Sequence, residues 1–195
     1  MLKLLKWAAI VVGGLIVLFI LVGFLLPSGY AVERSAVIAA EPARVHVLVG
    51  DLTRWPEWAP WGDMDPTLET VLGEQTEGVG AGQTWTGKDG GGALTFTASD
   101  PETGLTYDMT FNEGGWESQG VMTYDRTDAG TRVTWRFVGD VGANPIGRYM
   151  GLAMDAFVGP AFEAGLEKLK AQVESLPPEE EPAAEEDEGG TPASE

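Results

Sequence analysis

The chain has 195 residues, no cysteine and a formal net charge of −18 at pH 7. An acidic chain without a basic stripe argues against nucleic-acid binding and against docking on anionic lipid headgroups. The lack of cysteine excludes thiol nucleophiles and thiolate metal sites.

A long apolar run stands near the N-terminus. From Ala8 to Leu26, 19 residues carry no charged or strongly polar side chain. As a helix they extend about 28 Å, close to the roughly 30 Å hydrocarbon core of a bilayer. Trp7 and Tyr30 sit near its two ends, where amphipathic rings favour the headgroup layer. We therefore expect residues 1–29 to form a single transmembrane anchor.

The charges around this run predict its orientation. Lys3 and Lys6 precede it, and no basic residue follows until Arg34. The positive-inside rule then keeps the N-terminus cytoplasmic and puts the rest of the chain on the outer side, periplasmic or extracellular. A cleaved signal peptide is the alternative, although its apolar part is usually about 7–15 residues and residues 28–31 match a cleavage site poorly. A buried core helix is a third reading.

A strand and short helices begin the domain that follows. Residues 30–39 alternate loosely and contain β-branched residues, as in a strand. A helix is expected to start at Pro42, because proline is favoured in the first turn. Its apolar positions recur at i, i+3, i+4 and i+7: Val45, Leu48, Val49 and Leu52. Residues 54–61, rich in Trp and Pro, predict one irregular helical turn.

From about Pro66 the hydrophobic period changes to two, which predicts six strands. Glycine- and aspartate-rich turns separate them. Short links between consecutive strands indicate an antiparallel meander. The predicted strands are Thr67–Leu72, Gln83–Lys88, Ala93–Ser99, Leu105–Phe111, Glu117–Arg126 and Thr131–Gly139.

The pattern returns to helix before an acidic tail. A short helix is expected over residues 146–157, and Pro160 should open a longer one to Leu176. Phe162, Leu166, Leu169, Val173 and Leu176 form its apolar stripe. Residues 177–195 have many acids and no aromatic residue, which predicts a disordered tail, with an acidic interaction segment as the alternative.

These elements predict an α+β domain over residues 30–176, with the final helix covering the apolar face of the sheet. Alternation places large aromatic and methionine side chains on that face. The facing helix carries the small residues Ala161, Ala164 and Gly165. Small residues opposite large ones either interdigitate into a solid core or leave a cavity for an apolar ligand, and the pattern alone leaves both open.

Several segments resemble one known family. They are "PSGYAVERSAVIAAEPARVHVLVGDLTRWPEWAPW", "EGVGAGQTWTG", "GTRVTWRF" and "NPIGRYMGLAMDAFVGPAFEAGLEKLK". The most specific piece is W-x-x-W-x-P-W at Trp55, Trp58, Pro60 and Trp61. Together they resemble the START-like (SRPBCC) superfamily, in its polyketide cyclase/dehydrase and lipid-transport branch. The resemblance implies a helix-grip fold: a curved antiparallel sheet wrapped around the long C-terminal helix, with an apolar cavity between them.

The inward aromatic and methionine side chains would then line this cavity. The expected lining residues are Trp58, Trp61, Trp85, Phe96, Tyr107, Met109, Phe111, Met122, Trp135, Phe137, Met154 and Phe162. The Trp cluster itself has two readings, a structural plug at one end of the core or a gate for the ligand.

No catalytic, metal or cofactor site is predicted. The only histidine, His46, lies off the apolar stripe of its helix, so we expect it to face solvent. Asp63 and Asp65 lack the remaining ligands of a calcium loop. Gly78, Gly80 and Gly82 lead into a strand, unlike a dinucleotide-binding turn.

We therefore expect a membrane-anchored module that binds an apolar small molecule or lipid, with no nucleic-acid partner. A cyclase- or hydrolase-like enzyme using pocket carboxylates or Tyr107 is one alternative. A scaffold acting through the acidic tail is another. The sequence gives no indication of the oligomeric state.

Overall fold

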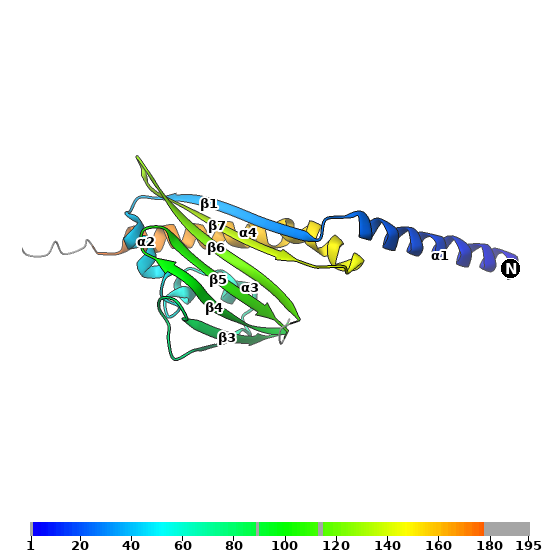
Figure 1. The fold of residues 1–195 in the computed structure, drawn as a ribbon, viewed down its shortest axis with the longest axis horizontal. Coiled ribbons are helices and arrows are strands. Elements are labelled where there is room, and N and C mark those ends of the chain that lie inside the picture. The colour runs from blue at the N-terminus through cyan, green and yellow to red at the C-terminus, as the bar shows by residue number, and fades with distance from the viewer. Residues whose placement is uncertain (1, 89, 113–114, 178–195) are drawn as a thin grey trace, which may run out of the picture.

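The computed structural model describes residues 2–88, 90–112 and 115–177. Figure 1 shows a helix that projects from one end of a domain built on a single curved sheet. The predicted tail lies almost wholly outside the described residues. The helices are α1 (Leu2–Leu25), α2 (Pro42–Val49), the 3-10 turn η1 (Trp55–Glu57), α3 (Trp61–Met64) and α4 (Pro145–Ser175).

The seven strands form one antiparallel sheet in the order β1-β7-β6-β5-β4-β3-β2. Strands β2 to β7 follow one another as the predicted meander, and β1 closes against β7. The strands are β1 (Gly29–Ile38), β2 (Glu69–Leu72), β3 (Gly82–Gly87), β4 (Gly90–Asp100), β5 (Gly104–Phe111), β6 (Trp116–Thr127) and β7 (Gly130–Asp140).

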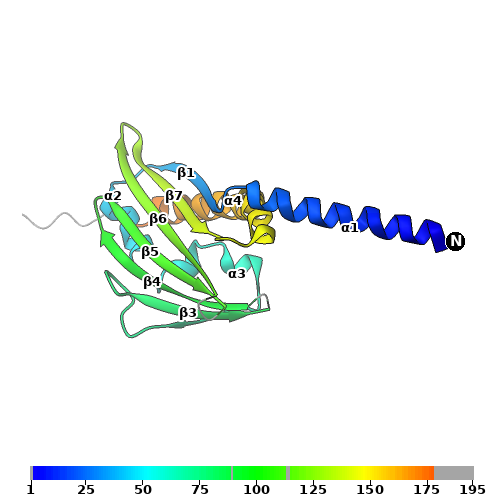
Figure 2. The ribbon, with the colours of Figure 1, turned by 45° about the vertical axis from the view of Figure 1, so that its right-hand side comes forward.

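Helix α4 covers the inner face of this sheet, so the helix-grip arrangement is confirmed (Figures 1 and 2). Its apolar stripe faces the sheet as predicted, with Phe162, Leu166, Leu169 and Val173 buried. Arg34 of β1 ties α4 to the sheet edge. Its guanidinium donates to Asp155 at 2.7 Å and to Glu163 at 2.6 Å.

The C-terminal helix differs from its prediction, because α4 is one helix and not two. Asn144 caps its start, since the side-chain oxygen accepts from the backbone N–H groups of Ile146 and Gly147. Pro160 lies inside the helix, where the prediction placed a helix start. Proline removes one helical hydrogen bond, which costs about 3 kcal/mol in an isolated helix. Packing of the flanking turns against the sheet offsets this cost.

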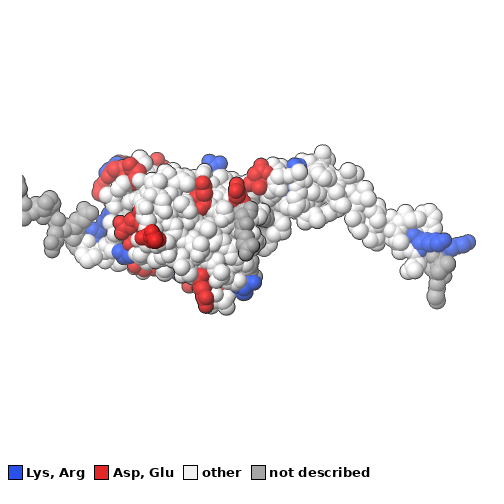
Figure 3. Space-filling model, turned by 60° about the horizontal axis from the view of Figure 1, so that its bottom comes forward, with Lys and Arg blue, Asp and Glu red and all other residues white. Residues whose placement is uncertain are grey.

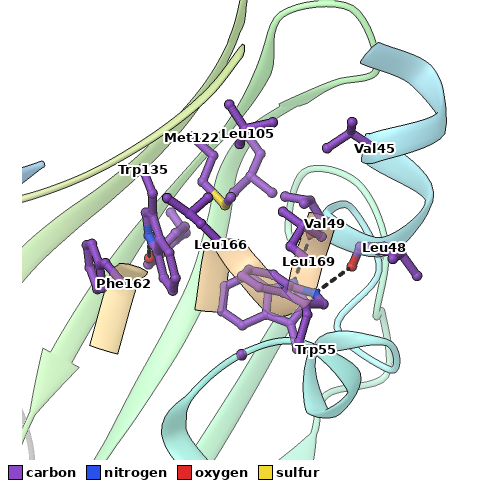
Figure 4. Packing of buried hydrophobic residues seen from close by; sticks show 14 of the residues in the cluster. Val45, Leu48, Val49, Trp55, Leu105, Met122, Trp135, Phe162, Leu166 and Leu169 are labelled. Atoms are coloured by element: carbon purple, nitrogen blue, oxygen red, sulfur yellow. Dashed lines mark hydrogen bonds between the residues drawn. The ribbon is translucent and has the colours of Figure 1, made fainter. Parts of the chain in front are cut away.

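The Trp cluster holds the end of α2. Trp55 donates its indole N–H to the carbonyl of Val49 at 2.9 Å (Figure 4). Trp58 donates its indole N–H to the carbonyl of Leu48 at 3.1 Å. The last carbonyls of a helix have no partner within it, so these two indoles complete the α2 terminus. The plug reading therefore describes Trp55 and Trp58, which are both buried.

A stacked pair of aromatic rings joins α4 to strand β7. The rings of Trp135 on β7 and Phe162 on α4 lie parallel, with centroids 3.9 Å apart (Figure 4). Gly165, one turn after Phe162, faces Trp135 and Pro60, and a Cβ there would lie 3.0 Å from Pro60 Cδ. Large and small residues thus interdigitate at this point, as a solid core requires.

Glycines in the strands make room for aromatic rings. A Cβ on Gly120 would lie 2.0 Å from Cζ of Tyr107, its cross-strand partner. A Cβ on Gly92 would lie 2.3 Å from Trp85, and one on Gly139 2.2 Å from the Tyr30 hydroxyl. Each ring therefore lies flat over a glycine of the neighbouring strand, which is one recognised use of glycine within a sheet.

The Gly120 contact can be tested by Gly120→Ala. The added methyl overlaps the Tyr107 ring, so we expect the free energy of unfolding to fall by about 1–3 kcal/mol. Chemical denaturation of the full chain in detergent, followed by tryptophan fluorescence, measures the change. Gly62→Ala is the control, because nothing lies within 4 Å of its Cβ position. Equal stability of the two variants would contradict this packing.

Candidate functional site

A pocket of about 390 Å³ lies between the sheet and the helices. Its walls come from α3 and the loop after it, from β2 to β5 and β7, and from the first half of α4. Most of the wall is apolar. The lining residues are Trp61, Met64, Asp65, Leu68, Thr70, Gln83, Trp85, Gly90, Gly91, Leu94, Tyr107, Met109, Phe111, Asn112, Phe137, Met154, Val158 and Phe162.

The pocket lies toward the end of the sheet from which α1 leaves. Gly90 and Gly91 begin β4, Phe111 ends β5, and Asn112 follows it. In both ribbon views these strand ends are on the same side of the domain as α1 (Figures 1 and 2). The opposite end of the domain, under α2, is filled by buried side chains.

The expected lining residues divide into two groups. Around the pocket lie Trp61, Trp85, Tyr107, Met109, Phe111, Phe137, Met154 and Phe162. In the buried core, outside the pocket wall, lie Trp58, Phe96, Met122 and Trp135. Sequence reasoning missed Met64, Leu68, Leu94 and Val158 as wall residues. Two of them carried a signal: Leu94 alternates with Phe96 on one face of its strand, and Val158 follows Met154 by one helical turn and so shares its face.

Tyr107 lines the pocket and carries a buried hydroxyl group. Its hydroxyl oxygen accepts a hydrogen bond from the indole N–H of Trp135 at 2.9 Å. Burial raises the pKa of this hydroxyl well above its usual range. Tyr107 therefore stays protonated and has its own O–H proton to offer to an acceptor.

The carboxylate in the wall, Asp65, is engaged by its own loop. It accepts hydrogen bonds from the backbone and hydroxyl of Thr67, at 2.9 and 2.6 Å, and from the backbone N–H of Lys88 at 3.2 Å. These bonds hold the pKa of Asp65 below its usual value. A carboxylate of this kind is a weak proton acceptor at neutral pH and shapes the loop instead.

His46 was predicted to face solvent, and this prediction is wrong. It is half-buried between α2 and the sheet, with Nδ1 3.2 Å from the Tyr124 hydroxyl and Nε2 3.1 Å from the Ser99 hydroxyl. The curved sheet folds over this side of α2, which helical periodicity alone could not reveal. His46 is outside the pocket wall, and burial lowers its pKa.

No group of three or more His, Asp or Glu side chains that could hold a metal ion occurs among the described residues. The pocket wall is mainly apolar, and its polar residues include Asp65, Thr70 and Tyr107. Gln83 and Asn112, which carry amides, also line the pocket.

A curved sheet that grips a long helix, with an apolar pocket between them, defines a START-like helix-grip domain. The chain belongs to the polyketide cyclase/dehydrase and lipid transport family, whose model matches residues 30–174. The resemblance inferred from the sequence is therefore confirmed. A comparison with curated proteins gave no match.

Solved structures share this fold at low identity. A protein of unknown function from Staphylococcus aureus is similar with a TM-score of 0.57 and 11% identity, over 75% of this chain and 94% of that one. A protein from Rhodobacter sphaeroides has a TM-score of 0.54 and 19% identity, over 76% and 94%. DynU16, from the dynemicin biosynthetic locus, has a TM-score of 0.54 and 16% identity, over 74% and 47%.

His46 predicts a pH dependence of stability. Its folded pKa lies below the ordinary value, so the unfolded chain binds more protons between the two pKa values. This contribution is fully present above about pH 6.5 and is lost as the pH falls through the folded pKa. In His46→Gln we expect a smaller loss of unfolding free energy between about pH 7.5 and 5.5. Parallel pH curves for the two proteins would contradict the assignment.

Proposed function

We propose that this protein binds an apolar small molecule or lipid in the pocket, and that α1 holds the binding domain at a membrane. The observation that carries the proposal is the pocket itself: an apolar wall with one buried, protonated hydroxyl, in a domain of a family that includes lipid transport. This combination suits ligands that are mainly hydrocarbon or aromatic and carry an acceptor.

The dimensions support a ligand of modest size. A volume of about 390 Å³ is near the lower end of ligand pockets, which run from about 300 to 1,000 Å³. Trp61 and Trp85 offer faces for a ring system, and Met109 and Met154 are flexible enough to adapt to its shape. The Tyr107 hydroxyl is suited to donate to a carbonyl or hydroxyl oxygen of the ligand.

Helix α1 supports the membrane part of the proposal. Among the described residues it is the one helix long and apolar enough to cross a bilayer, and nearly all of its surface is exposed. A signal sequence would pass the same test. Figure 3 shows an uncharged shaft with basic residues at its free end and most acids over the domain. Lys3 and Lys6 favour a cytoplasmic N-terminus, with the domain on the outer side.

Contacts between α1 and the domain favour retention of the helix over its removal. Arg148 of α4 donates to the carbonyls of Phe24 at 2.7 Å and Leu26 at 2.9 Å. These carbonyls end α1 and have no helical partners of their own. The positive charge of Arg148 also interacts favourably with the negative, C-terminal end of the α1 dipole. A cleaved leader would have no use for such a cap.

An enzyme of the cyclase or hydrolase type is the second candidate, favoured by the family description and by Tyr107 in the pocket. It would need a proton donor or acceptor with a pKa near neutrality. The pKa of Tyr107 is raised and the pKa of Asp65 is lowered, so both pKa values move away from neutrality. The pocket thus favours binding over proton transfer. The scaffold alternative concerns residues 177–195, nearly all outside the described part of the chain.

Val158→Trp tests ligand binding in the pocket. Val158 faces the pocket from α4, so an indole there fills space that the ligand needs. We expect the full chain in detergent to lose affinity for a fluorescent fatty acid by about tenfold or more, which is about 1.4 kcal/mol of binding free energy. Fluorescence titration measures the affinity.

Val79→Trp is the matched control, because Val79 is exposed and outside the pocket wall. It should bind as the unmodified chain does. Leu68→Trp fills the pocket from the opposite wall and should repeat the loss. If both pocket variants bind normally while remaining folded by circular dichroism, the ligand site is elsewhere.

A further inference from the structure

The first half of α4 exposes large apolar side chains that the pocket does not use. Ile146 is 61% exposed, Met150 50%, Leu152 57% and Phe157 66%. None of the four lines the pocket. Outside α1, few other large apolar side chains among the described residues are this exposed, and these four lie within about three turns of one helix. Exposed apolar surface of this kind marks a site of interaction.

This segment is attached to the end of α1. The Tyr149 ring stacks on the Phe19 ring, with centroids 4.1 Å apart and planes 6° apart. Its hydroxyl donates to the carbonyl of Phe19 at 2.8 Å. A Cβ on Gly23 would lie 2.8 Å from Cβ of Pro145. The start of α4 therefore packs directly against the last two turns of α1.

These contacts set the depth of α4 if α1 spans a bilayer. Phe19 is seven residues before Leu26, where the apolar run ends, so its carbonyl lies about 10 Å along the helix from that end. The Tyr149 hydroxyl would then be inside the hydrocarbon layer. A hydroxyl there needs an acceptor, and the Phe19 carbonyl supplies one.

The exposed residues lie on two sides of the segment: Ile146, Met150 and Phe157 lie within about 40° of one another around the helix, and Leu152 lies on the other side. Met150 and Leu152 are about 200° apart around the helix. A folded partner would cover one side, whereas fluid lipid covers both. The two charged residues of Pro145–Gly159 are both engaged: Arg148 with the α1 carbonyls, and Asp155 with Arg34. Neither is therefore an unpaired charge, which would be costly to place in lipid.

We propose that the first two turns of α4, from Pro145 to Leu152, are embedded in the same bilayer leaflet as the end of α1, with Phe157 at headgroup level. The occupant of this surface is the lipid bilayer. The inference rests on the proposed anchor. It gives the domain a second membrane contact, on the helix whose neighbouring face carries Met154 and Val158 into the pocket.

Single cysteines can test this depth, because the chain has none of its own. Ile146→Cys, Met150→Cys and Leu152→Cys, each carrying a spin label, are reconstituted as full chains in phosphatidylcholine vesicles. Collision with oxygen, which concentrates in lipid, is compared with collision with a water-soluble nickel chelate. Leu15→Cys on α1 is the lipid reference, and Val79→Cys is the water reference.

We expect the three α4 labels to match Leu15→Cys, with nickel collision several-fold below that of Val79→Cys. If they match Val79→Cys while Leu15→Cys stays in lipid, α4 is outside the bilayer and the inference is overturned, although the anchor stands. Shielding of Met150→Cys but not Leu152→Cys indicates a one-sided partner and also overturns it. A water-exposed Leu15→Cys removes the anchor and the inference together. None of these outcomes decides ligand binding, which the Val158→Trp titration measures separately.

Discussion

The stacked contact of Trp135 with Phe162 is the point on which the domain's organisation depends. Among the described residues α4 is the one long helix that covers the inner face of the curved sheet, and this pair fixes it against β7, the strand beside the β1 edge. Such a pair contributes about 0.5–1.5 kcal/mol beyond its buried area. Its larger effect is geometric, because it divides the interior. Toward α2 the side chains close into solid core, and toward α1 they leave the pocket.

The two halves of α4 consequently serve different purposes. After Phe162 the helix presents Leu166, Leu169 and Val173 to the sheet and supplies stability. Before it, Met154 and Val158 face the pocket while Met150 and Phe157 face outward. Gly159 and Pro160 separate the halves, and a Cβ on Gly159 would lie 2.1 Å from the Arg34 guanidinium. Glycine at this position therefore lets Arg34 reach both Asp155 and Glu163.

The sequence predicted the strands of the sheet well, because short runs with a hydrophobic period of two, separated by turn residues, have few possible secondary structures other than strands. Such patterns could not divide Trp135 from Phe137 or Phe96 from Met109, since core and pocket residues share one face of the sheet and differ in whether they lie toward α2 or toward α1. The prediction that His46 faces solvent was wrong because the apolar stripe of a helix does not reveal that the curved sheet also covers another side of that helix. Gly120 and Gly92 break the strand pattern, and only the rings of Tyr107 and Trp85 explain them. Pro160 was read locally as a helix start, whereas packing carries α4 through it.

The link between α1 and β1 is only three residues long, and Arg148 fastens its start to α4. With α1 in a bilayer, the pocket cannot turn freely or travel between compartments. The pocket would then meet ligands by their lateral diffusion in the plane of that leaflet. Ligand supply would then depend on the composition of one membrane and not on a soluble pool, so the protein would serve its own surface and could not act as a shuttle.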